Sequence, residues 1–217
     1  MPSAAIAPDW PAPANIVAGT YTRNQQHLIP AGSVVLKQVH GIHCVDVALS
    51  QPAVEADACF TSRPGLACAV LTADCLPILL CASDGTEIAA IHAGWRGLAA
   101  GVIESTLVCL RSDPSQLLAW LGPAISQQNF EVGREVREQF LDLAASTRRV
   151  ETEACFIATG EKFMADLYAL ARLRLAGAGV TQIWGGKHCT YTEAGLFHSY
   201  RRDGADAGRL TTVIAIT

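Results

Sequence analysis

Four apolar runs joined by short turns constrain the fold of this chain more than any other feature. They are ADACFTS (56–62), LACAVLTAD (66–74), LPILLCAS (76–83) and EIAAIHAG (87–94). The first two flank an Arg63-Pro64-Gly65 turn, and the last two flank Asp84-Gly85, a strong hairpin signal. Short apolar runs bounded by turn residues are typical of strands. We therefore expect a mainly antiparallel sheet that is partly buried on both faces.

The remaining elements are predicted from the same kinds of pattern. Apolar residues at helical spacing predict helices over 96–111, 133–144 and 162–176. Strands are expected over 34–40, 45–49, 117–125, 181–186, 196–203 and 210–216. Runs of strands followed by helices, rather than strict alternation, favour an α+β fold over a doubly wound sheet.

Length and composition favour one soluble domain over residues 1–217, with the proline-broken residues 1–16 as an extended arm. Half of the residues are hydrophobic and 17% are charged, so a large core can form. The net charge of −4, without a basic run, argues against binding to nucleic acid or to anionic membranes. The start lacks the pattern of a signal peptide, and no apolar stretch reaches the roughly 18 residues of a membrane span. A cytoplasmic protein is expected.

Eight cysteines could suggest disulfides, but in a cytosolic chain most are expected to be small buried hydrophobic residues. Cys68, Cys81 and Cys109 lie in strongly apolar runs and fit that expectation. Cys75 differs, because it follows Asp74 at the joint between two apolar segments.

Three short motifs place metal-binding side chains beside a glycine or an acid: QVHG at His40, TADC at Cys75 and IHAGWRG at His92. Two imidazoles and one thiolate are zinc ligands, and three ligands leave one coordination place free. Each residue also has a structural interpretation, and His43 competes for the ligand role. Cys75 could instead be a nucleophile or a buried thiol. Since a neighbouring acid raises the pKa of a free thiol, Asp74 favours metal ligation.

Candidate substrate contacts lie close to these motifs. Arg23, Gln38, Asp74 and Arg96 are proposed, because a guanidinium suits phosphate or carboxylate and the glycines after His92 allow a ligand to approach the backbone. Other residues considered for anion binding or as a base are Arg63, Arg201, Arg202 and Glu131. For each of these, a surface ion pair or a helix-start acid is the alternative interpretation.

Ordered motifs along the chain resemble one family. They are AGTYTR, QVHG, TADCLPILL, AAIHAGWRGLAAGVIE, WLGPAI, FEVG and FHSYRRD. From about residue 34 to the C-terminus the chain resembles the YfiH-like proteins, also called laccase-domain or multicopper polyphenol oxidase proteins. The resemblance implies a layered α+β sandwich of mainly antiparallel sheets and helices, with zinc held by His40, Cys75 and His92. Between Arg23 and Lys37 the chain is much shorter than the family pattern.

The resemblance also implies an activity: phosphorolysis of adenosine, inosine or methylthioadenosine with phosphate, and deamination of adenosine. We expect a zinc-dependent enzyme that is a monomer or a weak homodimer. A copper-dependent polyphenol oxidase is one alternative, but a multicopper centre needs on the order of ten histidines and this chain has six. A single copper ion stays compatible with the sequence. A hydrolase of cell-wall precursors with Cys75 as nucleophile and His92 or His40 as base is another alternative, and a non-catalytic binding module is the last.

Overall fold

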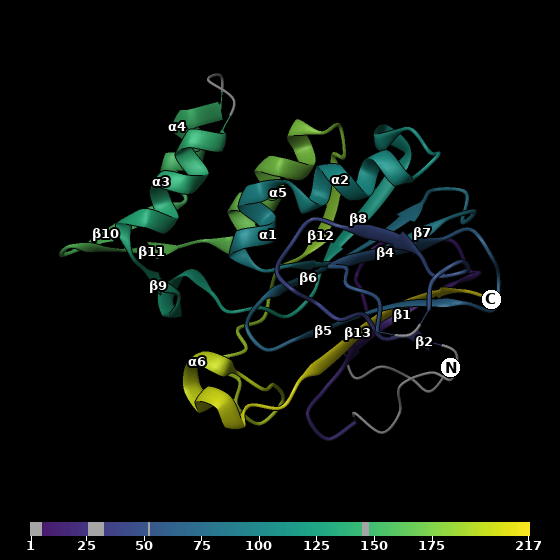
Figure 1. Ribbon diagram of the computed structural model, residues 1–217, viewed down its shortest axis with the longest axis horizontal. Helices are drawn as coiled ribbons and strands as arrows, with labels where there is room; N and C mark the ends of the chain where they lie inside the picture. The colour runs from purple at the N-terminus through teal and green to yellow at the C-terminus, as the bar shows by residue number, and fades with distance from the viewer. Residues whose placement is uncertain (1–5, 26–32, 52, 145–147) are drawn as a thin grey trace.

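The computed structural model describes residues 6–25, 33–51, 53–144 and 148–217, and their fold is α+β, as expected (Figure 1). A six-stranded sheet has the order β12 (Gln182–Gly185), β8 (Leu117–Leu121), β6 (Leu76–Ala82), β7 (Ile88–Ala93), β4 (Ala58–Thr61), β3 (Cys44–Asp46). A four-stranded sheet has the order β1 (Ile16–Tyr21), β13 (Leu210–Ile216), β5 (Ala67–Thr72), β2 (Ser33–Val34). A three-stranded sheet has the order β10 (Phe156–Thr159), β11 (Lys162–Ala165), β9 (Glu131–Val132).

The helices are α1 (Trp95–Ala100), α2 (Val102–Cys109), α3 (Arg134–Leu143), α4 (Arg149–Ala154), α5 (Leu167–Gly177) and α6 (Tyr200–Asp203). In Figure 1, α1, α2 and α5 lie above the six-stranded sheet and the four-stranded sheet lies below it. Most strand pairs are antiparallel, and the parallel pairs are β2–β5, β3–β4 and β12–β8. No helix in the described ranges is long and apolar enough to cross a membrane.

The six-stranded sheet is buried on both faces, as its apolar runs predicted, but it contains only three of the four runs expected in one sheet. The fourth run, over 66–74, forms β5 and lies in the four-stranded sheet, where it pairs with β13 and β2. All seven residues of β6 are buried, and alternate side chains reach opposite faces. Ile78 and Leu80 belong to the core under the helices, whereas Leu79 and Cys81 belong to the core between the two larger sheets. The hairpin expected at Asp84-Gly85 is confirmed, because β6 and β7 pair antiparallel.

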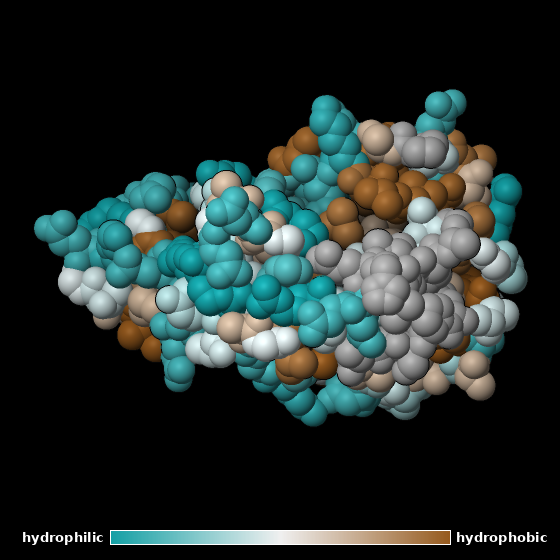
Figure 2. Space-filling view, turned by 90° about the horizontal axis from the view of Figure 1, so that it is seen from below, coloured by the Kyte–Doolittle hydropathy of each residue, from teal (hydrophilic) through white to brown (hydrophobic). Residues whose placement is uncertain are grey.

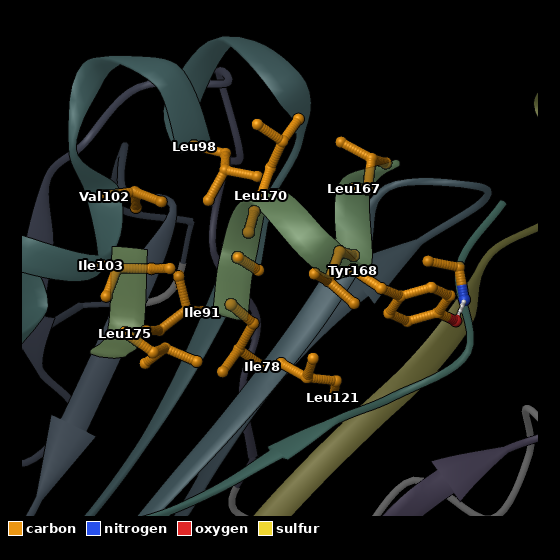
Figure 3. Close-up of a cluster of buried hydrophobic side chains, with 14 of the residues drawn as sticks. Ile78, Ile91, Leu98, Val102, Ile103, Leu121, Leu167, Tyr168, Leu170 and Leu175 are labelled. Atoms are coloured by element: carbon orange, nitrogen blue, oxygen red, sulfur yellow. Dashed lines mark hydrogen bonds between the residues drawn. The ribbon is translucent and has the colours of Figure 1, made fainter. Parts of the chain in front are cut away.

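The core under the helices fixes α1, α2 and α5 on this sheet. Figure 3 shows Ile78, Ile91 and Leu121 of the sheet facing apolar side chains of the three helices. Burying each such side chain stabilises the fold by roughly 1.5–3 kcal/mol. The hydroxyl of Tyr168 accepts a hydrogen bond from the Ala124 backbone N–H at 2.7 Å, so α5 also fixes the loop after β8.

The structure confirms the helix predicted over 133–144 within a few residues. It also confirms the strands predicted over 56–62, 66–74, 117–125, 181–186 and 210–216. The helix predicted over 96–111 was wrong as a single helix. Gly101 interrupts it at φ 105°, a left-handed conformation, and separates α1 from α2. The helix predicted over 162–176 was wrong at its start. Residues 162–165 form β11, and α5 begins only after Asp166, whose side chain caps it by accepting a hydrogen bond from the Ala169 N–H.

Three further strand predictions were wrong in whole or in part. Segment 196–203 ends in helix α6, capped by the Ser199 side chain. Segment 34–40 leaves the sheet after Val34, because its polar groups bond to other residues of the site described below. Segment 45–49 is a strand only to Asp46, whose carboxylate then accepts the Ala48 N–H in a turn.

None of the eight cysteines forms a disulfide. Cys68 and Cys81 are buried as expected, but Cys109 is only half-buried at the end of α2, so that prediction was wrong. The expected N-terminal arm lies partly outside the described residues. Within them, Ile6 forms an isolated bridge with Thr20, and Ile16 already belongs to β1.

Candidate metal centre and cavity

Two loops and strand β7 bring His40, Cys75 and His92 together at one end of the two larger sheets. One ligand atom from each lies within 4.8 Å of the others, and this is a group of the kind that can hold a metal ion. Cys75 Sγ lies 3.8 Å from His40 Nε2, and the two imidazole rings are edge-to-face with centroids 4.8 Å apart. Zn–S and Zn–N bonds of about 2.3 and 2.0–2.1 Å put S and N about 3.6 Å apart around a tetrahedral ion. The Sγ–Nε2 distance is therefore close to the value that one tetrahedral ion of this size needs.

His92 is oriented by a carboxylate that sequence reasoning missed. Its Nδ1–H donates to Asp57 Oδ1 at 2.7 Å, and both side chains are buried. A carboxylate can only accept, so Nδ1 carries a proton and Nε2 is the nitrogen left for a metal. The one available signal was an acid inside an otherwise apolar strand segment.

Asp57 also shapes the loop that carries His40. Its carboxylate accepts backbone N–H groups of Val39 (3.2 Å), His40 (2.9 Å) and Gly41 (2.7 Å). Burial alone would raise the pKa of Asp57, but the hydrogen bonds from His92 and from these amides outweigh burial and hold the pKa below its ordinary value. One ionised carboxylate thus positions two of the three ligands.

The two imidazoles next to Cys75 change the pKa of its thiol. Burial alone would raise the pKa of Cys75, but hydrogen bonds with His40 and His92 lower that pKa to about 6. Burial would lower the pKa of His92, yet Asp57 and Cys75 raise it to about 9. Cys75 is therefore a thiolate at neutral pH, and a metal ion would compete with the proton on His92.

The backbone at the site adopts conformations that L-residues rarely take. His40 has φ 61° and Asp74, just before Cys75, has φ 84°. Such positive φ values cost roughly 1–3 kcal/mol and persist only where surrounding bonds impose them. Here hydrogen bonds to Asp57 hold the first, and the second is held by bonds from Thr190 and Ser199 to the Asp74 carboxylate.

Glycines allow the loops to approach one another. A Cβ on Gly94 would lie 2.7 Å from His40 Cδ2 and 3.2 Å from Cys75 Sγ. A Cβ on Gly97 would lie 2.7 Å from the carbonyl oxygen of Gly41. A side chain at either position would therefore separate α1 from the ligands, which explains the two glycines of AGWRG.

A cavity of about 570 Å³ opens beside the three ligands. Aromatic side chains of Trp95, Phe130 and Tyr200 line it. Three arginines, Arg96, Arg201 and Arg209, also line it. Its size fits the range of small-molecule sites, and its walls can receive a planar, partly anionic ligand.

The residues expected to contact substrate have different surroundings. Arg96 lines the cavity, is exposed, and lies 4.4 Å over the Trp95 ring. Gln38 also lines the cavity, but its amide pairs with both backbone groups of Leu71 at 2.7 Å, so it supports the wall. Arg23 does not line the cavity and donates to the Ala194 carbonyl oxygen at 2.6 Å.

Asp74 lines the cavity as well, yet its buried carboxylate accepts hydrogen bonds from Thr190, Ser199 and the Arg201 N–H. It therefore holds the C-terminal segment against the site. His43, the competing ligand, is outside the group and bonds instead to the Glu55 carbonyl oxygen.

Of the other residues considered from the sequence, only Arg201 lines the cavity. Neither Arg63 nor Arg202 lines the cavity. Glu131 belongs to β9 and pairs with Lys162 on the surface, so it is neither a base at the cavity nor a helix-start acid.

The fold and the site together define a known class of protein. The structure is similar to that of the Neisseria meningitidis protein NMB0706, with a TM-score of 0.85, 38% identity and coverage of 97% of this chain and 98% of that one. It is also similar to a Bacillus licheniformis hypothetical protein YfiH, with a TM-score of 0.79, 26% identity and coverage of 90% and 79%. The chain belongs to the family described as multi-copper polyphenol oxidoreductase laccase, whose model matches residues 13–217.

Curated relatives cover nearly the whole chain. One is "Purine nucleoside phosphorylase YfiH" of Escherichia coli (strain K12), 44% identical over 242 residues, with 96% of this chain and 97% of the relative covered. Another is "Purine nucleoside phosphorylase PA4543" of Pseudomonas aeruginosa, 40% identical, with 96% and 97% covered. The first alignment is longer than this chain of 217 residues, so that relative carries residues that this chain lacks. The family resemblance inferred from the motifs is thus confirmed.

Proposed function

We propose that the protein is a zinc-dependent purine nucleoside phosphorylase that acts on adenosine, inosine and methylthioadenosine and also deaminates adenosine. The observation that carries this proposal is the His40–Cys75–His92 group at the wall of a cavity that also presents Arg96. The names of the relatives from Escherichia coli and Pseudomonas aeruginosa support the phosphorolytic activity.

The donor set favours one zinc ion. Two imidazole nitrogens and one thiolate suit a borderline-soft divalent ion, and a third protein ligand without a fourth is typical of catalytic zinc. Among the described residues, this is the one group of three or more metal-binding side chains that was found. A single ion fits that arrangement, whereas a multicopper cluster would need further histidines at the same place.

In phosphorolysis, a phosphate oxygen forms a bond to the ribose C1′ while the bond from C1′ to the purine nitrogen breaks, and the base leaves with that electron pair. A bound zinc ion would supply positive charge and a Lewis-acid site at the cavity wall. Arg96 is suited to hold the phosphate, because its guanidinium has no hydrogen-bond acceptor within the described part of the chain. Asp57 and Gln38 keep the ligands and the cavity wall in place.

Deamination of adenosine would use the same cavity. Water adds at C6 of the purine, and the amino group leaves as ammonia. Methylthioadenosine differs from adenosine only at the 5′ position of the ribose, so the same contacts to base and phosphate would serve it. Zinc, methylthioadenosine and deamination are thus parts of one proposal about one site.

The direct test is to incubate zinc-loaded, metal-analysed protein with inosine and phosphate and to quantify ribose 1-phosphate and hypoxanthine. Both products are expected from the wild type, and both should be lost in Cys75→Ala. Cys109→Ala is the matched control, because this half-buried thiol lies on α2 outside the ligand group and should leave turnover unchanged. An inactive zinc-loaded wild type, or full turnover in Cys75→Ala, would remove the proposal.

A second function is favoured by one specific observation. The lowered pKa of Cys75 beside two imidazoles is also what a cysteine hydrolase needs. Zinc separates the two alternatives, because it would activate the phosphorylase and block the thiolate of a hydrolase. Hydrolysis of a cell-wall precursor by metal-free protein, stopped by added zinc, would support the hydrolase instead.

A further inference from the structure

The segment FHSYRRD contains four consecutive side chains, from Ser199 to Arg202, to which the proposed function gives no role. The segment forms the cap and body of α6, which lies at the lower left of Figure 1 beside the end of the four-stranded sheet. The surface over α6 is mainly hydrophilic (Figure 2). Three of the four residues prove to be structural.

Ser199 and the backbone of Arg201 fix α6 next to the metal ligands. The Ser199 hydroxyl donates to Asp74 Oδ2 at 3.0 Å, and the Arg201 N–H donates to the same oxygen at 2.6 Å. Asp74 is buried and directly precedes Cys75. Since hydrogen bonds to a buried carboxylate are strong, the helix is held firmly at the cavity.

The two guanidinium groups fix the helix on its other sides. Arg201 donates to the Asn129 and Glu131 carbonyl oxygens at 3.4 and 2.9 Å, and its Cζ lies 5.5 Å from the centre of the Phe130 ring. Arg202 donates to carbonyl oxygens of its own loop and pairs with Asp203. Both arginines therefore stabilise the position of α6 through hydrogen bonds to backbone carbonyl oxygens.

Tyr200 is the exception in this segment. It lines the cavity and is 56% exposed, and neither its ring nor its hydroxyl has a partner in the described part of the chain. The two other aromatic rings at the cavity already carry an arginine: Arg96 lies over Trp95, and Arg201 lies over Phe130. The rigid segment thus presents one aromatic ring without a stacking partner beside the proposed metal centre.

We propose that Tyr200 stacks on the purine base and is a substrate-binding residue of the site. The inference rests on the proposed function, because it assigns the base of that substrate to one wall of the cavity. Stacking on an aromatic ring holds a base by its face without reading its edge. Adenine and hypoxanthine are therefore accepted alike, which agrees with the proposed range of nucleosides.

The test compares zinc-loaded wild type with Tyr200→Ala, Tyr200→Phe and Tyr191→Ala at saturating phosphate. Tyr191 is the matched control, since it is 36% exposed on the same loop and does not line the cavity. Loss of one stacked ring is expected to raise KM for inosine and adenosine about 5- to 100-fold in Tyr200→Ala, with kcat and zinc content nearly unchanged. Tyr200→Phe and Tyr191→Ala should match the wild type.

An unchanged KM for the nucleosides in Tyr200→Ala would overturn the inference. An equal rise of this KM in Tyr200→Phe would also overturn it, because the role would then belong to the hydroxyl. A rise in KM for phosphate alone would overturn it as well. If the wild type shows no phosphorolysis, the proposed function fails separately, and hypoxanthine binding by calorimetry replaces KM. Weaker binding to Tyr200→Ala than to wild type would still support stacking. Equal binding, or none to either protein, would refute it.

Discussion

The role of Asp57 gives the most discriminating prediction about the centre. In Asp57→Asn, one carboxylate oxygen becomes an NH₂ group. Each oxygen accepts two hydrogen bonds: Oδ1 from His40 and His92, and Oδ2 from Val39 and Gly41. Either orientation of the amide therefore leaves two donors, at least one of them partly buried, without an acceptor. At about 1–3 kcal/mol for each, the variant should lose about 2–6 kcal/mol of unfolding free energy.

Zinc affinity should fall as well, because an amide no longer fixes the tautomer of His92 or increases its basicity. Loss of such a carboxylate partner weakens metal binding about 10- to 100-fold. Affinity is measured by competition with a chromophoric chelator, and stability by denaturant unfolding of metal-free protein. Both are compared at pH 7.5, where the low pKa of Asp57 keeps the wild-type carboxylate ionised.

Glu87→Gln is the matched control, since Glu87 is buried and its carboxylate accepts the backbone N–H groups of Arg111 and Ser112 at the other end of β7. It should destabilise the protein without changing zinc affinity. Equal zinc affinities for Asp57→Asn and wild type, or equal weakening by both variants, would refute this account of Asp57.

Two further predictions concern the ligands themselves. Gly94→Ala should weaken zinc binding at least tenfold, because the new methyl group would crowd the His40 imidazole and the Cys75 sulfur. Gly195→Ala is the control, because the space around its Cβ is open and its zinc affinity should not change. Equal zinc affinities for the two variants would contradict the packing argument. Alkylation of metal-free Cys75 should rise with pH through a midpoint near 6 and reach a plateau by about pH 7.5, because a depressed pKa makes the thiolate form early, and zinc should suppress it. The measurement uses a Cys189→Ser background, because the pKa of Cys189 is also lowered, to about 7. A midpoint near 8.5 would contradict the thiolate assignment.

Much of the sheet was predictable from local patterns. The β6–β7 hairpin follows from two apolar runs around Asp84-Gly85, and the buried faces follow from the lack of charge in those runs. The three candidate ligands were recognisable from the motifs QVHG, TADC and IHAGWRG, in which a metal-binding side chain stands beside a glycine or an acid. Gly101 is a typical helix-breaking residue and Asp166 a typical helix cap. The helical spacing of the apolar residues around them nevertheless favoured a continuous helix in each case.

What could not be predicted depends on contacts between distant residues. The hydrogen bond between Asp57 and His92 joins residues 35 positions apart in the sequence, and the bond between Asp74 and Ser199 joins residues 125 positions apart. Segment 34–40 has the composition of a strand, but Gln38 bonds to β5 and the His40 N–H bonds to Asp57, so its backbone follows the site instead of the sheet. No local pattern contains those partners. The same holds for α6, whose position depends on Asp74.

The most direct test of the account is anomalous diffraction at the zinc edge from crystals of the purified protein. One peak is expected, about 2.0–2.3 Å from an imidazole nitrogen of His40, the sulfur of Cys75 and Nε2 of His92. No peak at these three atoms in zinc-soaked crystals, or peaks for several copper ions elsewhere, would contradict a single zinc centre.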